Sequence, residues 1–265
     1  MTDPLPRSVG LIGHGAIGSV VACRLVACDV PSAKLVGIHA RRRLVDPPAP
    51  QVDADELLAM SDVIVEAAGH QAVRDHAVPT LEAGVNLVLV SLGALGDADL
   101  EATIRAAGPG RLTICTGAVG GIDLLRSAHR MADLDYVQIT TTKRPRALVQ
   151  PWMDETLLAK LETEVVATTV FDGSARDAVG RFPKSVNVAA TLALALDDWD
   201  LVRVRIVADP GAPHTRHVIH ADGAAGSYRF DIANVPSEHN PATSAVVPYA
   251  ALQAVADLCA GPMAL

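Results

Sequence analysis

Three glycines near the N-terminus have the spacing of a loop that binds a dinucleotide. They follow an apolar run at residues 9–12 and precede a helical pattern at residues 16–28. Gly13 would allow a tight turn, Gly15 would let the backbone approach phosphates, and Gly18 would let the helix pack on the strand. A lone motif of this kind is weak, but the strand before it and the helix after it favour a nucleotide site. The predicted cofactor-binding residues of this turn are Gly13, Gly15, Ala16, Ile17 and Gly18.

A second chemical signal follows the second predicted strand. An acidic residue at this point would bind the ribose 2′-hydroxyl of NAD. The strand end instead reads His39-Ala40-Arg41-Arg42-Arg43, and the first acid after it is Asp46. Arginines pair well with a 2′-phosphate. We therefore expect Arg41 and Arg42 to bind the cofactor and NADP(H) to be used well. If these side chains point into solvent, NAD and NADP would both be accepted.

Alternating strands and helices must position this loop. The apolar strand patterns and the helical patterns between them predict an open parallel sheet with helices on both faces, a Rossmann-type α/β domain over residues 1–116. The expected strands are residues 34–39, 62–68, 85–90 and 111–115, and the expected helices after the first are 71–83 and 97–107.

The pattern changes after residue 116. The next strands alternate as if half exposed to water, which predicts a second α+β domain over residues 117–240 with a mixed or antiparallel sheet and helices on one face. Residues 242–260 read as a helix, and we expect the segment 241–265 to return to the nucleotide domain. The expected strands of the second domain are residues 137–142, 165–167, 201–208, 217–221 and 227–233.

Composition excludes several classes of function. The 265-residue chain is half apolar and has a formal net charge of −8, which argues against binding to nucleic acid or an anionic membrane. No apolar stretch reaches the ~18 residues of a membrane span, and no signal pattern is present, so a cytoplasmic protein is expected. The four cysteines form no CxxC pair and lie near no histidines at metal-ligand spacing, so no metal is expected.

Five later segments are more specific than the glycine turn. They are Thr116-Gly117-Ala118-Val119-Gly120-Gly121-Ile122-Asp123, Phe171-Asp172-Gly173-Ser174-Ala175-Arg176-Asp177-Ala178, Phe182-Pro183-Lys184-Ser185-Val186-Asn187-Val188-Ala189-Ala190-Thr191, Asp209-Pro210 leading to His217, and Asn240-Pro241-Ala242-Thr243-Ser244. In this order, and over essentially its whole length, the chain resembles the L-aspartate dehydrogenase family. The resemblance implies a nicotinamide-dependent oxidoreductase that interconverts L-aspartate with iminoaspartate, and hence with oxaloacetate and ammonia. In that family iminoaspartate can feed quinolinate and NAD synthesis.

The resemblance assigns the acid/base role to His217, which follows the Asp-Pro turn. The reaction needs a group that titrates near neutrality, because a proton leaves the amine and a water must be activated for imine hydrolysis. His214 and His220 flank this position and are the alternatives. Strand alternation would place His217 and Ile219 on one face and His220 on the other.

Further residues are implied for the two ligands. Asn187 and Ala118 match family residues that contact the nicotinamide half of the cofactor, although Asn187 would also suit a helix cap. The two carboxylates of aspartate need fixed positive charge or several donors. The candidate substrate-binding residues are Lys184, Thr243 and Ser244, with Arg144 and Arg176 as further candidates.

Two other readings compete with this one. Another two-domain reductase, of the homoserine dehydrogenase or dihydrodipicolinate reductase type, would share the domain plan. A nicotinamide-binding sensor would keep the fold without turnover. The exposed face of the second sheet would suit a homodimer, the commonest closed assembly.

Overall fold

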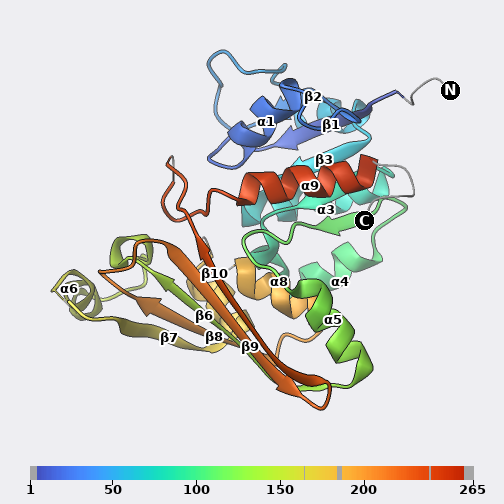
Figure 1. Cartoon of the computed structure of the whole chain (residues 1–265). Coiled ribbons are helices and arrows are strands. Elements are labelled where there is room, and N and C mark those ends of the chain that lie inside the picture. Colours follow the sequence, from blue (N-terminus) through green and yellow to red (C-terminus); the bar gives the residue numbers. More distant parts are fainter. Residues whose placement is uncertain (1–4, 164, 184–186, 239, 260–265) are drawn as a thin grey trace. The chain divides into compact units, whose positions relative to one another are not determined.

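The computed structural model describes residues 5–163, 165–183, 187–238 and 240–259. The chain forms two compact units, the first from residues up to Gly117 together with those from Val247 onward, the second from Ala118 to Val246 (Figure 1). In the part of the chain that the structure describes, no helix has the length and apolar character to span a membrane.

The first unit is built on a parallel sheet with the strand order β2-β1-β3-β4-β5. Its central strands are buried on both faces, as their continuous apolar runs predict. The order reverses between β1 and β3, and in such sheets ligands bind beyond the carboxyl ends of the strands at that point. The predicted α/β class is confirmed. The strands are β1 (Arg7–Ile12), β2 (Ala33–His39), β3 (Val63–Glu66), β4 (Asn86–Leu89) and β5 (Leu112–Ile114).

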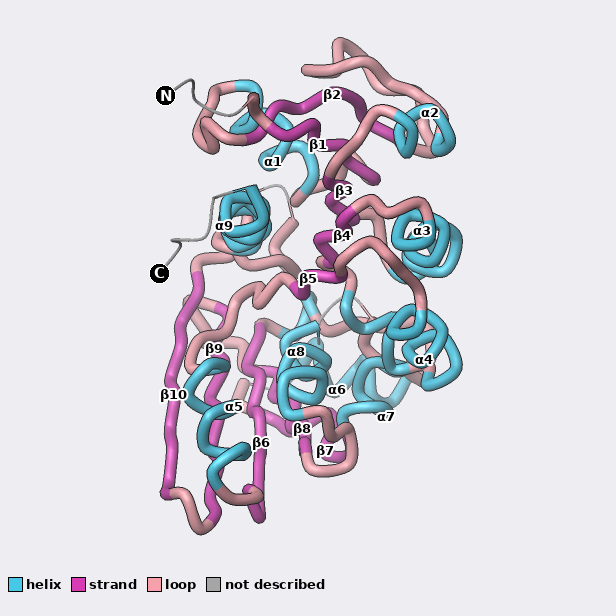
Figure 2. The backbone as a smooth tube through the Cα atoms, turned by 90° about the vertical axis from the view of Figure 1, so that its right-hand side faces the viewer, coloured by secondary structure: helices cyan, strands magenta, loops and turns pink. Residues whose placement is uncertain are grey.

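Helices cover both faces of this sheet. Figure 2 shows α1 and α9 on one side of the strands and α2, α3 and α4 on the other. Helix α9 brings the C-terminal segment back to this unit, where Ala251 and Val255 join the same buried cluster as Val21 of α1. The elements are α1 (Gly18–Val26), α2 (Ala54–Ala59), α3 (His70–Glu82), η1 (Leu92–Gly96), α4 (Ala98–Ala106) and α9 (Val247–Cys259).

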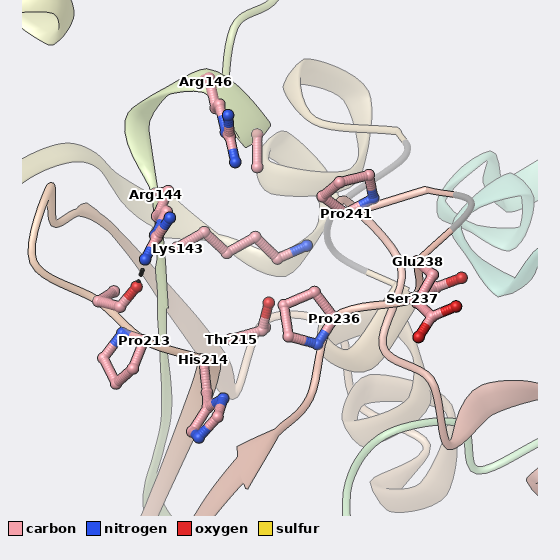
Figure 3. A pocket seen from close by; sticks show the side chains of 12 residues that line it. Lys143, Arg144, Arg146, Pro213, His214, Thr215, Pro236, Ser237, Glu238 and Pro241 are labelled. Atoms are coloured by element: carbon pink, nitrogen blue, oxygen red, sulfur yellow. Dashed lines mark hydrogen bonds between the residues drawn. The ribbon is translucent and has the colours of Figure 1, made fainter.

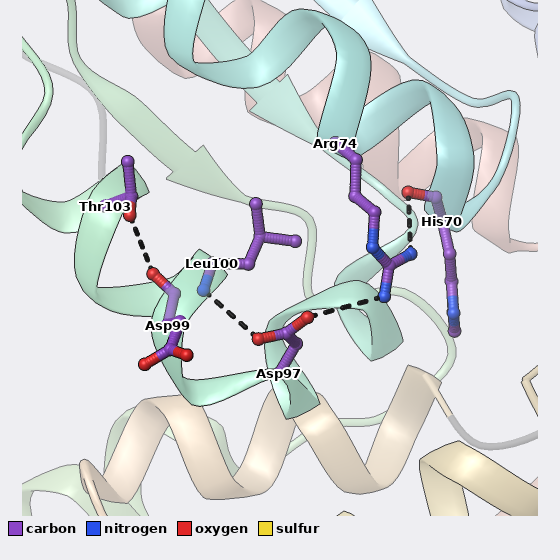
Figure 4. Close-up of polar contacts among 6 residues, drawn as sticks. All are labelled: His70, Arg74, Asp97, Asp99, Leu100 and Thr103. Carbon is purple, nitrogen blue, oxygen red and sulfur yellow. Dashed lines mark hydrogen bonds and ion pairs between the residues drawn. The ribbon is translucent and has the colours of Figure 1, made fainter.

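Polar contacts join α3 to the start of α4. Asp97 accepts a hydrogen bond from the backbone N–H of Leu100 at 3.3 Å and thereby caps α4. Its other oxygen lies 3.7 Å from Arg74, which also donates to the carbonyl of His70 (Figure 4). Both charged side chains are exposed, so this ion pair contributes at most about 1 kcal/mol. The cap explains why α4 begins one residue after the predicted start at residue 97.

The second unit contains a mixed sheet with the order β10-β9-β6-β8-β7, in which only β6 and β8 are parallel. Its inward residues are buried beneath α7 and α8, while the other face carries exposed charged residues. The elements are α5 (Ile122–Met131), β6 (Leu134–Lys143), η2 (Pro145–Ala147), α6 (Glu155–Thr163), β7 (Thr168–Ser174), α7 (Ala175–Arg181), α8 (Asn187–Leu196), β8 (Val202–Ala208), β9 (Thr215–Gly223) and β10 (Gly226–Asn234).

The predicted strand at residues 165–167 is wrong. Val165 and Val166 are 88% and 60% exposed and lie before β7. The ladder with β8 begins only where Thr168 pairs with Ala208. Two β-branched residues favour extended backbone, but without a partner strand they do not form a strand.

Candidate active site

The glycine turn has the backbone that a phosphate-binding loop requires. Gly13 has a φ of 96°, in the left-handed region, and its N–H donates to the carbonyl of His39 at 2.8 Å. A Cβ at Gly18 would collide with the carbonyl of Gly13, whereas a Cβ at Gly15 would meet nothing within 4 Å. No side chain among the described residues caps the N-terminus of α1 at Ile17. The turn is therefore open at Gly15, and no side chain occupies the start of α1, which fits a dinucleotide pyrophosphate.

A cavity of about 810 Å³ lies beside this turn, within the first unit. Gly13 and Gly15 line it together with Arg41 and Arg42 from the segment after β2. The guanidinium of Arg42 donates to the carbonyl of His14 at 3.4 Å, which directs this exposed side chain toward the turn. The structure thus brings the glycines and these two arginines, predicted from separate signals, to one cavity.

The carboxylate of Glu66, at the end of β3, holds the backbone of the loop that follows, and Ala67 and Ala68 of this loop line the cavity. Its Oε1 accepts from the N–H groups of Ala68 and Gly69 at 2.7 and 2.8 Å and from the Ser91 hydroxyl at 3.0 Å, and its Oε2 accepts from the Ser91 N–H at 3.0 Å. Burial raises the pKa of Glu66, while these donors act in the opposite direction. Glu66 is not among the residues predicted from sequence; the signal that points to it is an acid at the end of an apolar strand.

In the second unit, His217 lies on the buried face of the sheet. Strand β9 pairs antiparallel with β6, and the register sets His217 opposite Thr141. The Thr141 hydroxyl and His217 Nδ1 are 3.0 Å apart, and His217 is 2% exposed. His220 is exposed on the other face, where it lies 3.3 Å from Asp222. The expected separation of the two histidines by strand alternation is confirmed.

A buried lysine accompanies this histidine. Lys143 lies two residues beyond Thr141 on the same face of β6, and its Nζ donates to the Ala242 carbonyl at 2.9 Å. Burial lowers the pKa of Lys143 to about 8. Burial, and then the charge of Lys143, lower the pKa of His217 to about 3. The sequence favours a His217 that titrates near neutrality, whereas in the structure its pKa lies well below that range. The cause is burial, because a low-dielectric surrounding disfavours the charged imidazolium. Neither Thr141 nor Lys143 was singled out from sequence, although both occupy inward positions of an alternating strand.

The segment Asn240–Ser244 folds into a turn against Lys143. The Thr243 N–H donates to the Asn240 carbonyl, and the Thr243 carbonyl accepts from the Ser237 N–H, each at 2.8 Å. Ser244 is buried. The turn thereby presents the Ala242 carbonyl to Lys143.

The remaining predicted residues have different surroundings. Asn187 is the first residue of α8 and is half-buried. The Ala118 carbonyl accepts from the Asn234 side chain at 2.9 Å, which ties the loop before α5 to the end of β10. Lys184 lies outside the described residues. The structure therefore brings Thr243 and Ser244 to the vicinity of Lys143 within this unit.

A pocket of about 290 Å³ opens where Lys143 ends β6. Figure 3 shows the Lys143 side chain running across it toward Pro241. Arg144, Arg146 and His214 add further basic groups to the lining, and Glu238 is its acidic residue. Arg144 is held by a 2.8 Å hydrogen bond from its Nε to the Ala212 carbonyl. The pocket is thus suited to an anion.

Comparison with known proteins gives consistent matches over both units. A family model described as aspartate dehydrogenase, C-terminal, matches residues 123–258, and one described as homoserine dehydrogenase, NAD binding domain, matches residues 13–110. An L-aspartate dehydrogenase from Ralstonia nicotianae is 34% identical over 93% of this chain and 96% of its own length. One from Polaromonas is 37% identical with the same coverage. The crystal structure of aspartate dehydrogenase from Thermotoga maritima superposes with a TM-score of 0.76 at 25% identity, over 98% of this chain and 99% of that one.

Proposed function

The chain belongs to the L-aspartate dehydrogenase family, and from this premise we propose that it interconverts L-aspartate with iminoaspartate, and hence with oxaloacetate and ammonia, with His217 as the proton acceptor. The observation that carries the proposal is the buried group of His217, Thr141 and Lys143 on one sheet face. It is an NAD(P)-dependent oxidoreductase. When bound, the nicotinamide cofactor supplies the hydride acceptor of the oxidation and the hydride donor of the reverse reaction.

His217 acts as a neutral base in this proposal. With its pKa lowered to about 3, the imidazole is unprotonated throughout the neutral range and has a lone pair available. In the tautomer whose Nδ1–H donates to Thr141, the lone pair is on Nε2. Nε2 would accept a proton from the substrate amine and return it to the imine nitrogen, which leaves the imidazole neutral again. It would then accept a proton from the water that attacks the imine and pass that proton to the departing ammonia. Thr141 orients the ring through its hydrogen bond with Nδ1.

The cofactor would be held by the glycine turn, through Gly13, Gly15, Ala16, Ile17 and Gly18. Ala118 and Asn187 are the proposed contacts of the nicotinamide half, on the strength of the resemblance. We further propose that Arg41 and Arg42 bind the 2′-phosphate of NADP(H), because both line the cavity at the turn and the segment holds no acid before Asp46. Thr243 and Ser244 are the proposed donors to the substrate, together with Lys184.

Replacing both Arg41 and Arg42 with alanine should lower kcat/KM for NADPH by about 10–100-fold, because two charge-assisted contacts to the phosphate are lost. The value for NADH should change by less than about 3-fold, since its ribose carries no phosphate. Initial rates with each cofactor at saturating oxaloacetate and ammonia give the ratio. Arg43→Ala is the matched control, because Arg43 is not among the lining residues of the cavity. An equal loss with NADH would show that the arginines do not read the 2′-phosphate.

The function itself is tested by following NAD(P)H consumption with oxaloacetate and ammonia, and NAD(P)H formation with L-aspartate. Turnover in both directions is expected. Activity on homoserine or on a dihydrodipicolinate instead would favour the alternative reductases. Cofactor binding without turnover of any amino or keto acid would favour the sensor.

Two wider proposals concern the context of the enzyme. Iminoaspartate released by this reaction would supply quinolinate formation in NAD synthesis. The exposed face of the second unit's sheet would form a homodimer, which light scattering on the purified chain tests directly.

A further inference from the structure

Lys143 presents an unbalanced charge. The residue is 4% exposed, and its ammonium donates to the Ala242 carbonyl at 2.9 Å. Among the described residues no carboxylate forms an ion pair with it. A buried ammonium is costly unless it is paired. A buried lysine to which the described residues offer a carbonyl but no carboxylate suggests an anionic partner that arrives as a ligand.

The surroundings indicate an anionic ligand. Lys143 forms part of the lining of the 290 Å³ pocket, beside Arg144, Arg146 and His214 (Figure 3). Glu238 is the acidic residue in that lining, and it is exposed. A carboxylate is small enough for this volume and accepts hydrogen bonds from an ammonium at close range.

We propose that Lys143 binds one of the two carboxylates of the dicarboxylic substrate. The inference rests on the proposed function and adds to it the fixed positive charge that this substrate requires. Lys143 and Thr141 lie on the same face of β6, and Thr141 pairs with His217, so a carboxylate held by Lys143 would lie close to the proposed base.

This arrangement also couples substrate binding to the base. The positive charge of Lys143 disfavours a proton on His217. A carboxylate bound to Lys143 offsets that charge, so the imidazole tolerates a proton better when substrate is present than when it is absent. The base would thus become a stronger proton acceptor once the correct anion is bound.

Binding of succinate, which has two carboxylates and no amine, tests the proposal without turnover. We expect the full chain, saturated with cofactor, to bind succinate in a calorimetric titration. Lys143→Gln should weaken this binding by about 10–100-fold, the effect of losing one charge-assisted interaction. Lys160→Gln makes the same change at an exposed lysine of the second unit and should leave the dissociation constant unchanged. Cofactor affinity should be unchanged in both variants.

The choice of variants separates charge from structure. Glutamine retains an N–H donor for the Ala242 carbonyl. If Lys143 served only to hold that carbonyl, succinate binding would therefore be unchanged in Lys143→Gln. Lys143→Arg retains the charge and should restore succinate binding to within about 10-fold of the original. If the glutamine variant fails to fold, Lys143→Met replaces it in the succinate titration. Methionine removes the buried charge, so this variant is expected to melt at a higher temperature than the parent chain.

The outcomes distinguish this inference from the proposed function. Aspartate turnover in the parent chain, with succinate affinity and the KM for aspartate both unchanged in Lys143→Gln, would overturn the role of Lys143 alone. Lys143-dependent succinate binding without any aspartate turnover would reject the reaction and keep the carboxylate site. Inorganic phosphate binding that depends on Lys143, when succinate binding does not, would show an anion site unrelated to the substrate.

Discussion

Replacing His217 with alanine should lower kcat by about 10²–10⁴-fold and leave cofactor affinity nearly intact. The expected loss is that of a positioned general base, because no other described histidine shares the buried face of β9 with His217. Steady-state rates with L-aspartate, together with a fluorescence titration of NAD(P)H, give the two quantities. His220→Ala is the matched control: it lies three residues along the same strand, on the exposed face. Full turnover in His217→Ala would reject the assignment.

The same variant should change the acid sensitivity of folding. In the unfolded chain His217 takes up a proton near its ordinary pKa of 6.5, whereas the folded protein excludes that proton until about pH 3. The unfolded state therefore binds more protons in this window, and stability falls as pH drops from about 6.5 toward 3. His217→Ala removes this contribution, so its free energy of unfolding should decline less steeply over the same range. Urea denaturation at several pH values measures the slope, with His220→Ala as the reference.

Replacing Glu66 with glutamine should destabilise the first unit by about 2–4 kcal/mol, as expected when buried donors lose their acceptor. All four groups that Glu66 contacts donate hydrogen bonds to it. A glutamine at this position has one acceptor oxygen, and its NH2 group would face at least one of those donors without being able to accept a hydrogen bond from it. Chemical denaturation measures the loss. Glu82→Gln, at an exposed position in α3, is the control and should change stability by less than about 0.5 kcal/mol.

Cofactor affinity should fall in the same Glu66 variant. Glu66 fixes the backbone of Ala68 and Gly69, and Ala67 and Ala68 line the cavity beside the glycine turn. A loosened loop no longer presents that wall in one conformation. If Glu66→Gln unfolds at the same denaturant concentration as the parent and binds NAD(P)H equally well, the carboxylate has neither role.

Much of the fold was accessible from sequence because the signals are local. Residues 86–89 are buried on both sides of a parallel sheet and read as an unbroken apolar run, while β9 alternates and has one buried face. The glycine turn was visible because its spacing follows from the backbone that phosphates need. The predicted strand at residues 165–167 is wrong because the ladder with β8 does not reach Val165 and Val166, although both residues favour extended backbone.

The sequence by itself determined the two fold classes, the nucleotide turn and the family, since periodicity, glycine spacing and ordered motifs are all properties of the chain. The tertiary structure decided which side chains meet. The register of β6 against β9 sets Thr141 opposite His217, and the turn at Asn240–Ser244 brings the Ala242 carbonyl to Lys143, 99 residues away in the chain. Burial on that face then lowers the pKa values of His217 and Lys143. Strand pairing and burial are set by contacts between distant segments, so no local pattern reports them.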